Sequence, residues 1–174
     1  MKFGDEAWTP KKLIEAIEEV EDVRFTLDVA ATRENTLCER FYSKEENGLK
    51  QPWTGVVWCN PPYSKGNIAQ WVKKAISELD RDGGPEMTMM LLPSDTSTAW
   101  FHDMVWMRAE DVTFLKGRIA FEGPEKGRVG APFPSMLVKF LRGGDNIGAP
   151  SCFSWAWKEV LERDEDSSGT LQKP

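Results

Sequence analysis

Four consecutive residues, Asn60-Pro61-Pro62-Tyr63, combine groups that could hold a flat amine. Asn60 offers a carboxamide oxygen, Pro61 offers a backbone carbonyl on a residue with a fixed φ, and Tyr63 offers an aromatic face. The two oxygens can accept both N–H bonds of an exocyclic amine while its ring stacks on Tyr63. These contacts draw the nitrogen lone pair out of the ring, so the amine can attack a carbon electrophile. We infer that this electrophile is a methyl sulfonium.

An apolar run leads directly into these four residues. Val56, Val57 and Trp58 suit a buried strand. The two prolines that follow cannot donate ladder hydrogen bonds, so the strand must end at Asn60. The same pattern also fits a simple Pro-Pro turn after a buried strand, with no chemistry attached.

Asn-Pro-Pro-Tyr resembles the catalytic motif of S-adenosylmethionine-dependent amino-methyltransferases. The chain is similar in particular to the small phage-type, Dam-like DNA adenine-N6 methyltransferases. The resemblance covers roughly residues 8 to 141 in segments that follow the family's order, among them Trp8-Thr9-Pro10, Asp28 to Ala31 and Gly117 to Phe121. It implies direct methyl transfer to adenine N6 in DNA, with the target base flipped out of the stack. Asn60, Pro61, Pro62 and Tyr63 would then be the catalytic residues.

The resemblance also implies a place for S-adenosylmethionine. Asp28 lies at the carboxyl-terminal end of an alternating segment, residues 23–29, just before its last residue. Ligands of open α/β sheets bind beyond the carboxyl ends of strands. A carboxylate there can pair with the methionine ammonium and offset the sulfonium charge. Ala30 and Ala31 match the small residues of the family's first motif, although its fuller glycine-rich form is absent. An Asp at a strand end can also be a turn residue.

Two further segments are assigned to the cofactor by resemblance. In the family, Trp-Thr-Pro lies against the methionine end, so Trp8, Thr9 and Pro10 take that role here. Helix capping by Thr9, with Pro10 in the first helical position, explains the same residues without a ligand. Glu45 and Glu46 are candidates for holding the ribose, although solvated loop charges are the simpler interpretation.

Contacts with DNA must come from local basic residues, because the net charge of the chain is −6. Lys65 follows the catalytic segment, and the glycine-rich loop over residues 122–130 carries Lys126 and Arg128 at its tip. Together with Arg118 they form the expected nucleic-acid-binding set. Arg118 could instead pair with an internal carboxylate, and the loop could be merely solvated.

Strands and helices alternate along the chain. We expect strands over residues 23–29, 41–42, 56–58, 87–92, 112–115 and 136–141, and helices from residues 10, 68 and about 98. This order predicts an α/β, Rossmann-like S-adenosylmethionine-dependent methyltransferase fold with a mostly parallel sheet flanked by helices. Residues 1–161 should form one methyltransferase domain, closed by an element near Trp155 and Trp157. The acidic tail, residues 162–174, should be disordered.

Several classes of protein are disfavoured. Cys38, Cys59 and Cys152 form no CxxC pair, and His102 is the sole histidine, so neither disulfides nor a metal are expected. His102 is interpreted as a packing or surface residue rather than a catalytic one. No apolar run approaches about 18 residues, which argues against a membrane span. The expected location is a reducing cytoplasm, that of a bacterial host if the chain is phage-encoded.

Two alternatives stay open. The same site geometry could serve a methyltransferase that acts on RNA or on a protein glutamine amide. The missing glycines and the acidic charge would also fit a catalytically degenerate nucleic-acid-binding module.

Overall fold

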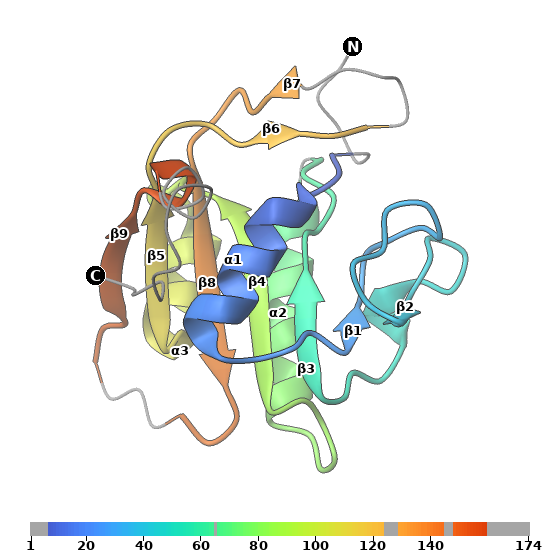
Figure 1. Cartoon of the computed structure of the whole chain (residues 1–174). Helices are drawn as coiled ribbons and strands as arrows, with labels where there is room; N and C mark the ends of the chain where they lie inside the picture. The colour runs from blue at the N-terminus through green and yellow to red at the C-terminus, as the bar shows by residue number, and fades with distance from the viewer. Residues whose placement is uncertain (1–6, 65, 124–128, 145–147, 160–174) are drawn as a thin grey trace.

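The computed structural model describes residues 7–64, 66–123, 129–144 and 148–159. Its main feature is a seven-stranded sheet in the order β2-β1-β3-β4-β8-β5-β9 (Figure 1). All neighbouring strands are parallel except β8, which is antiparallel to both β4 and β5. The strands are β1 Leu27–Asp28, β2 Arg40–Phe41, β3 Val56–Cys59, β4 Met87–Pro93, β5 Asp111–Leu115, β8 Ser135–Leu141 and β9 Ser151–Trp155.

Helices cover both faces of this sheet (Figure 1). The two long helices are α1 Lys11–Glu21 and α2 Asn67–Leu79, and the short elements are η1 Gly48–Lys50, the π-helical η2 Phe101–Val105 and α3 Trp106–Arg108. The apolar stripe of α1, with Leu13, Ile14 and Ile17, is buried against the sheet. None of the described helices is long and apolar enough to cross a lipid bilayer.

The central strands are buried on both faces, which explains their almost continuous apolar sequence. In β4, Met89 and Leu91 pack on the side of α1, whereas Met90 and Leu92 pack on the side of α2. Residues alternate between the two faces of a strand, so each face of β4 receives a full apolar set. The predicted α/β class with a mostly parallel, helix-flanked sheet is confirmed.

A small second sheet stands above the carboxyl-terminal ends of β3 and β4 (Figure 1). It consists of β6 Ala120–Phe121 and β7 Val129–Gly130, which pair antiparallel. Trp8 adds an antiparallel bridge to Glu122 on the other side of β6. The sequence predicted only a loop for residues 122–130, so β7 is a new element.

Two local predictions were wrong. The strand expected over residues 23–29 is restricted to β1, because the buried Glu18 carboxylate accepts the Phe25 N–H at 2.8 Å and holds this segment to α1. Pairing with β3 begins only where the Thr26 N–H reaches the Val56 carbonyl at 2.8 Å. Thr9 does not cap α1, since the cap residue is Pro10 and it is extended, with no side-chain hydrogen bond.

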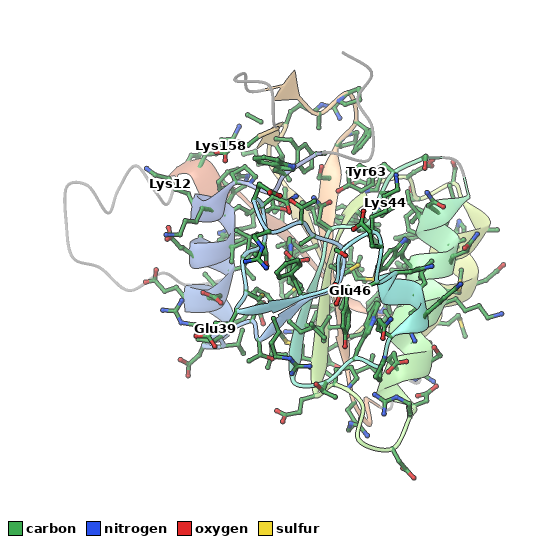
Figure 2. The ribbon with its side chains drawn as sticks, turned by 90° about the vertical axis from the view of Figure 1, so that its right-hand side faces the viewer. Lys12, Glu39, Lys44, Glu46, Tyr63 and Lys158 are labelled. Atoms are coloured by element: carbon green, nitrogen blue, oxygen red, sulfur yellow. The ribbon has the colours of Figure 1, made fainter. Side chains whose placement is uncertain are left out.

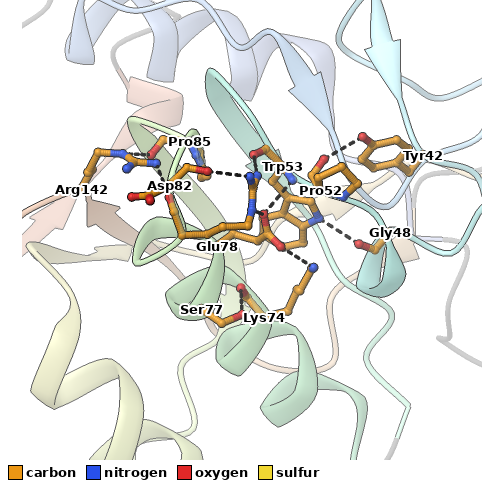
Figure 3. A network of polar contacts seen from close by, with 11 residues as sticks. Tyr42, Gly48, Pro52, Trp53, Lys74, Ser77, Glu78, Asp82, Pro85 and Arg142 are labelled. Carbon is orange, nitrogen blue, oxygen red and sulfur yellow. Dashed lines mark hydrogen bonds and ion pairs between the residues drawn. The ribbon is translucent and has the colours of Figure 1, made fainter.

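A polar network fixes the approach to β3 (Figure 3). Glu78, at the end of α2, is 5% exposed and accepts hydrogen bonds from the Trp53 N–H at 2.9 Å and from Lys74 and Arg81. Burial raises the pKa of the Glu78 carboxyl, but these donors outweigh burial and hold the pKa below its usual value. The Trp53 indole N–H donates to the Gly48 carbonyl at 2.8 Å. The segment before β3 is therefore anchored to α2 and η1.

The predicted closing element is strand β9 together with Trp157. Trp155 and Trp157 are both buried, and β9 extends the sheet beside β5. The predicted acidic tail, residues 162–174, lies outside the described residues.

Candidate active site

The crevice between β1 and β3 is the point where the sheet order reverses. The chain runs from β1 outward to β2 and then returns to β3 on the other side of β1. Asp28 ends β1 and is in register with Trp58, so Asp28 and Asn60 leave adjacent strands at the same edge. Ligands of open α/β sheets bind at such switch points.

Asp28 is a buried carboxylate with no cationic partner in the part of the chain that the structure describes. It is 3% exposed, accepts the Ala30 N–H at 3.3 Å, and no described cation lies within ion-pair distance. Burial raises the pKa of Asp28 to about 7, although backbone hydrogen bonds from Ala30 and Leu37 act in the opposite direction. Buried charges in proteins are normally paired, so this position suits a cationic ligand group.

Thr9 provides a second buried polar group that is unsatisfied in the described part of the chain. Its side chain is 7% exposed, and among the described residues its hydroxyl has no hydrogen-bond partner. Thr9, Asp28, Ala30, Asn60 and Pro61 line one small cavity of about 20 Å³. Buried hydroxyls are usually satisfied, so Thr9 also points to a ligand at this place.

The cavity is also lined by residues that were not predicted, and some predicted residues lie outside its lining. Asn35 and Leu37 line the same cavity, and they were not predicted because residues 32–51 lack periodicity. Trp8 and Pro10, next to Thr9, are partly buried but are not among the lining residues. Ala31, 6% exposed, belongs to the buried core.

The Asn60 carboxamide is oriented by two hydrogen bonds. Its Nδ2 donates to the Ala7 carbonyl at 2.7 Å, and its Oδ1 accepts from the Tyr63 hydroxyl at 2.5 Å. A carboxamide oxygen can accept two hydrogen bonds, so Oδ1 retains acceptor capacity. Among the described residues, no donor is bonded to the Pro61 carbonyl. Two consecutive residues after β3 therefore each offer an acceptor.

Tyr63 is held by aromatic rings. Its ring meets Phe133 edge-on at 5.2 Å and Phe121 at 6.1 Å between centroids. Its hydroxyl lies 3.2 Å from the Leu91 carbonyl as well as bonding Asn60. Burial raises the pKa of Tyr63 well above its usual value, so the phenol acts as a neutral donor. Phe121 and Phe133 are neighbours of the site that sequence reasoning did not assign.

A wider groove of about 740 Å³ opens beside β2. Glu45 and Glu46 line it together with Tyr42 and Ser43. The Glu46 carboxylate accepts the Ser43 N–H at 2.8 Å, which closes a local turn. Both candidate ribose acids thus adjoin a groove of a size typical of ligand pockets.

Basic side chains gather at the same end of the molecule as Tyr63. Lys12, Lys44 and Lys158 lie at that end (Figure 2). Arg118 is exposed, and none of the described carboxylates pairs with it. Its backbone carbonyl accepts a hydrogen bond from the Lys158 ammonium at 2.7 Å. The predicted residues Lys65, Lys126 and Arg128 lie outside the described residues.

His102 lies on η2 with an exposed side chain. Its ring meets the Phe101 ring edge-on at 5.7 Å. The role of His102 as a packing or surface residue stays a prediction.

Comparison with known proteins identifies close relatives. The family model described as DNA N-6-adenine-methyltransferase (Dam) matches residues 2–143. A DNA N-6-adenine-methyltransferase of Escherichia phage T1 is 40% identical over 136 residues, which cover 69% of this chain and 55% of the relative. The chain therefore spans about half of the T1 protein's length. A DNA N-6-adenine-methyltransferase of Haemophilus phage HP1 is 34% identical over 144 residues, which cover 80% of each chain.

Proposed function

Because the chain belongs to the DNA N-6-adenine-methyltransferase (Dam) family, we propose that it transfers a methyl group from S-adenosylmethionine to adenine N6 in DNA. The target base would be flipped out of the stack, since its amine cannot be reached inside a duplex. One observation carries the proposal: the buried Asp28 carboxylate, which pairs with none of the described cations, shares a cavity with the Asn60 acceptor. A cation-binding group and an amine-binding group then lie on either side of one reaction site.

The residues at the switch point fit S-adenosylmethionine. Asp28 would bind its ammonium group, and the Thr9 hydroxyl would gain a polar partner from the methionine end. Ala30 lines the same cavity with a small side chain, and Trp8 and Pro10 flank Thr9. When bound, S-adenosylmethionine supplies an electrophilic methyl group on a positively charged sulfur.

Binding requires the crevice to widen. The cavity at Asp28 measures about 20 Å³, room for about one water molecule. Asn35 and Leu37 form part of its wall, and a shift of the segment that carries them would admit the methionine end. The neighbouring groove would take the nucleoside end, with Glu45 or Glu46 accepting hydrogen bonds from the ribose hydroxyls.

The catalytic tetrapeptide would hold the acceptor amine. Asn60 Oδ1 and the Pro61 carbonyl would each accept one N6–H bond, Tyr63 would stack on the base, and Pro62 would keep the backbone rigid. With S-adenosylmethionine held at Asp28, its methyl carbon would exchange the bond to sulfur for a bond to N6, and the surplus N6 proton would pass to water. No side chain is needed as a strong base, which agrees with the neutral Tyr63 phenol.

DNA would approach the end of the molecule that carries Tyr63. Lys158 lies at that end and its ammonium donates to the Arg118 backbone carbonyl, so both residues would contribute cations there. Lys65, Lys126 and Arg128 remain proposed members of the same phosphate-binding set. Local contacts of this kind let a chain of net charge −6 hold a polyanion.

The proposal is tested by incubating the protein with labelled S-adenosylmethionine and pools of DNA, RNA and protein. The labelled nucleic acid is then digested and its nucleosides are analysed. We expect N6-methyladenine in DNA alone. Label in RNA or on protein glutamine would assign the other methyltransferase activity. Absence of label and of S-adenosylmethionine binding by calorimetry would indicate a degenerate binding module.

A further inference from the structure

We propose that the backbone carbonyl of Ala7 is the group that positions the catalytic Asn60 carboxamide, and that it makes this chain dependent on Asn rather than Asp at position 60. The inference rests on the proposed function, because it concerns how the amine acceptor is aimed. Ala7 lies 53 residues before Asn60 in the sequence, and the Asn60 Nδ2 atom donates to its carbonyl at 2.7 Å.

The bond to Ala7 decides which way the carboxamide faces. A backbone carbonyl is only an acceptor, so it must receive Nδ2 and cannot face Oδ1. Oδ1 is thereby turned to the opposite side, where the Tyr63 hydroxyl bonds to it. A carboxamide turned by 180° would place two oxygens together at Ala7 and offer N–H bonds to an amine that also donates. The Ala7 carbonyl therefore keeps the acceptor aimed at the substrate.

Ala7 is itself held by the small second sheet. The Trp8 N–H donates to the Glu122 carbonyl at 2.8 Å, and the Glu122 N–H donates to the Trp8 carbonyl at 2.9 Å. Glu122 directly follows β6, whose Phe121 packs edge-on against Tyr63. The β6 hairpin thus supports Asn60 through Ala7 and supports Tyr63 through Phe121.

An Asp at position 60 would not satisfy this arrangement. Its carboxylate could still accept from an amine, but it has no hydrogen for the Ala7 carbonyl. It would also add a second negative charge to the cavity that holds Asp28. Because the Asp28 charge is a separate effect, the contribution of Ala7 must be isolated with a second substitution.

Glu122→Pro removes the N–H that donates to the Trp8 carbonyl, and Glu122→Ala is the matched control because it keeps that N–H. Each substitution is introduced both into the unsubstituted chain and into the Asn60→Asp variant. The single-turnover methylation rate and the S-adenosylmethionine Kd of all these proteins are measured at pH 8. With Asn60, we expect Glu122→Pro to lower the rate about five- to tenfold, as for one lost hydrogen bond, and Glu122→Ala to leave it unchanged. The Kd should stay within about twofold of its original value in both Glu122 variants, since Glu122 does not line the cavity proposed for the cofactor.

Asn60→Asp should lower the methylation rate at least about a hundredfold. Adding Glu122→Pro to this variant should lower the rate further by less than about twofold, because the hydrogen bond to the Ala7 carbonyl is already lost. An Asn60→Asp rate near that of Asn60, or an equal cost of Glu122→Pro in both backgrounds, would overturn the positioning role.

A measurement on the unsubstituted chain covers the case in which Glu122→Pro does not fold. The side-chain amide hydrogens of Asn60 should exchange with solvent more slowly than those of Asn47, whose side chain has no described hydrogen bond. Equal exchange rates would refute the Ala7 contact even if the chain methylates no DNA, so the two proposals fail separately.

Discussion

At the scale of single residues, Asp28 combines a cost to the fold with a use in binding. Its pKa is about 7 in the fold and near 3.8 in an unfolded chain. Between these values the folded chain binds more protons than the unfolded one, so the contribution of Asp28 to stability falls as pH rises from about 4 to 7. Above pH 7 the full cost of the buried charge is present.

We therefore expect Asp28→Asn to raise the thermal stability of the free chain more at pH 8 than at pH 5. The same substitution should weaken S-adenosylmethionine binding by about 1.5–3 kcal/mol, as expected for a lost hydrogen bond to a charged group. For the unsubstituted chain, affinity should decrease as pH falls below about 7, because Asp28 then carries a proton. Calorimetry and melting curves at the two pH values check both effects. Unchanged cofactor affinity in a folded Asp28→Asn variant would contradict the assignment.

Tyr63 has two separable contributions. Its ring is the proposed stacking surface, worth about 1–3 kcal/mol per base, and its hydroxyl bonds Asn60 Oδ1. Tyr63→Phe keeps the ring and should lower the methylation rate by no more than about fivefold, the effect of one neutral hydrogen bond. Tyr63→Trp should also remain active, whereas Tyr63→Ala should lose most activity with near-normal cofactor affinity. If Tyr63→Phe lost as much activity as Tyr63→Ala, the hydroxyl and not the ring would be the important group.

At the scale of elements, the Glu78 network determines how β3 is presented. Hydrogen bonds hold the Glu78 pKa below its usual value despite burial, so this group stabilises the fold above about pH 4.5 and less so as pH falls through its folded pKa. Glu78→Ala would leave the Trp53 N–H and the partly buried Lys74 without their acceptor. We expect a destabilisation of about 2–4 kcal/mol in urea unfolding at pH 7. Glu86→Ala, an exposed acid that precedes β4, should have little effect.

The elements that could be predicted are those whose own residues decide their structure. The apolar run of β4 and the helical spacing of apolar residues in α2 were enough to predict these two elements. The prolines at positions 61 and 62 were enough to predict where β3 ends. The length of β1 was not predictable from its alternation, because the competing partner of Phe25 is Glu18 in the preceding helix. The bridge between Trp8 and Glu122 was missed because it joins segments more than a hundred residues apart.

At the scale of the whole molecule, the site is assembled from distant segments. The sequence indicated Thr9, Asp28 and Asn60 separately, and the sheet order brings all of them to one cavity. Asn35 and Leu37 also line it, although nothing in their types or spacing distinguished them. Their place depends on the long connection between β1 and β2, whose path is set by tertiary contacts.

DNA binding should depend on salt through cations at one end of the molecule. Arg118→Ala combined with Lys158→Ala should weaken DNA binding and flatten the slope of log affinity against log salt by up to about 2 units. Arg108→Ala is the control, because this exposed arginine pairs with Asp80 at the carboxyl-terminal end of α2. Equal slopes in the double variant and the unsubstituted chain would exclude both residues from the phosphate contacts.

Lys126→Ala combined with Arg128→Ala should likewise weaken DNA binding and flatten the salt slope by up to about 2 units.

The most direct test of the account is the single-turnover rate of N6-methyladenine formation in DNA by the unsubstituted chain and by Asn60→Ala, measured with their S-adenosylmethionine affinities. The account predicts methylation by the unsubstituted chain, loss of at least about a thousandfold in Asn60→Ala, and cofactor affinities that agree within about twofold. Asn60 would then act on the acceptor amine alone. Substantial methylation by Asn60→Ala, or a loss explained by weaker cofactor binding, would contradict the account.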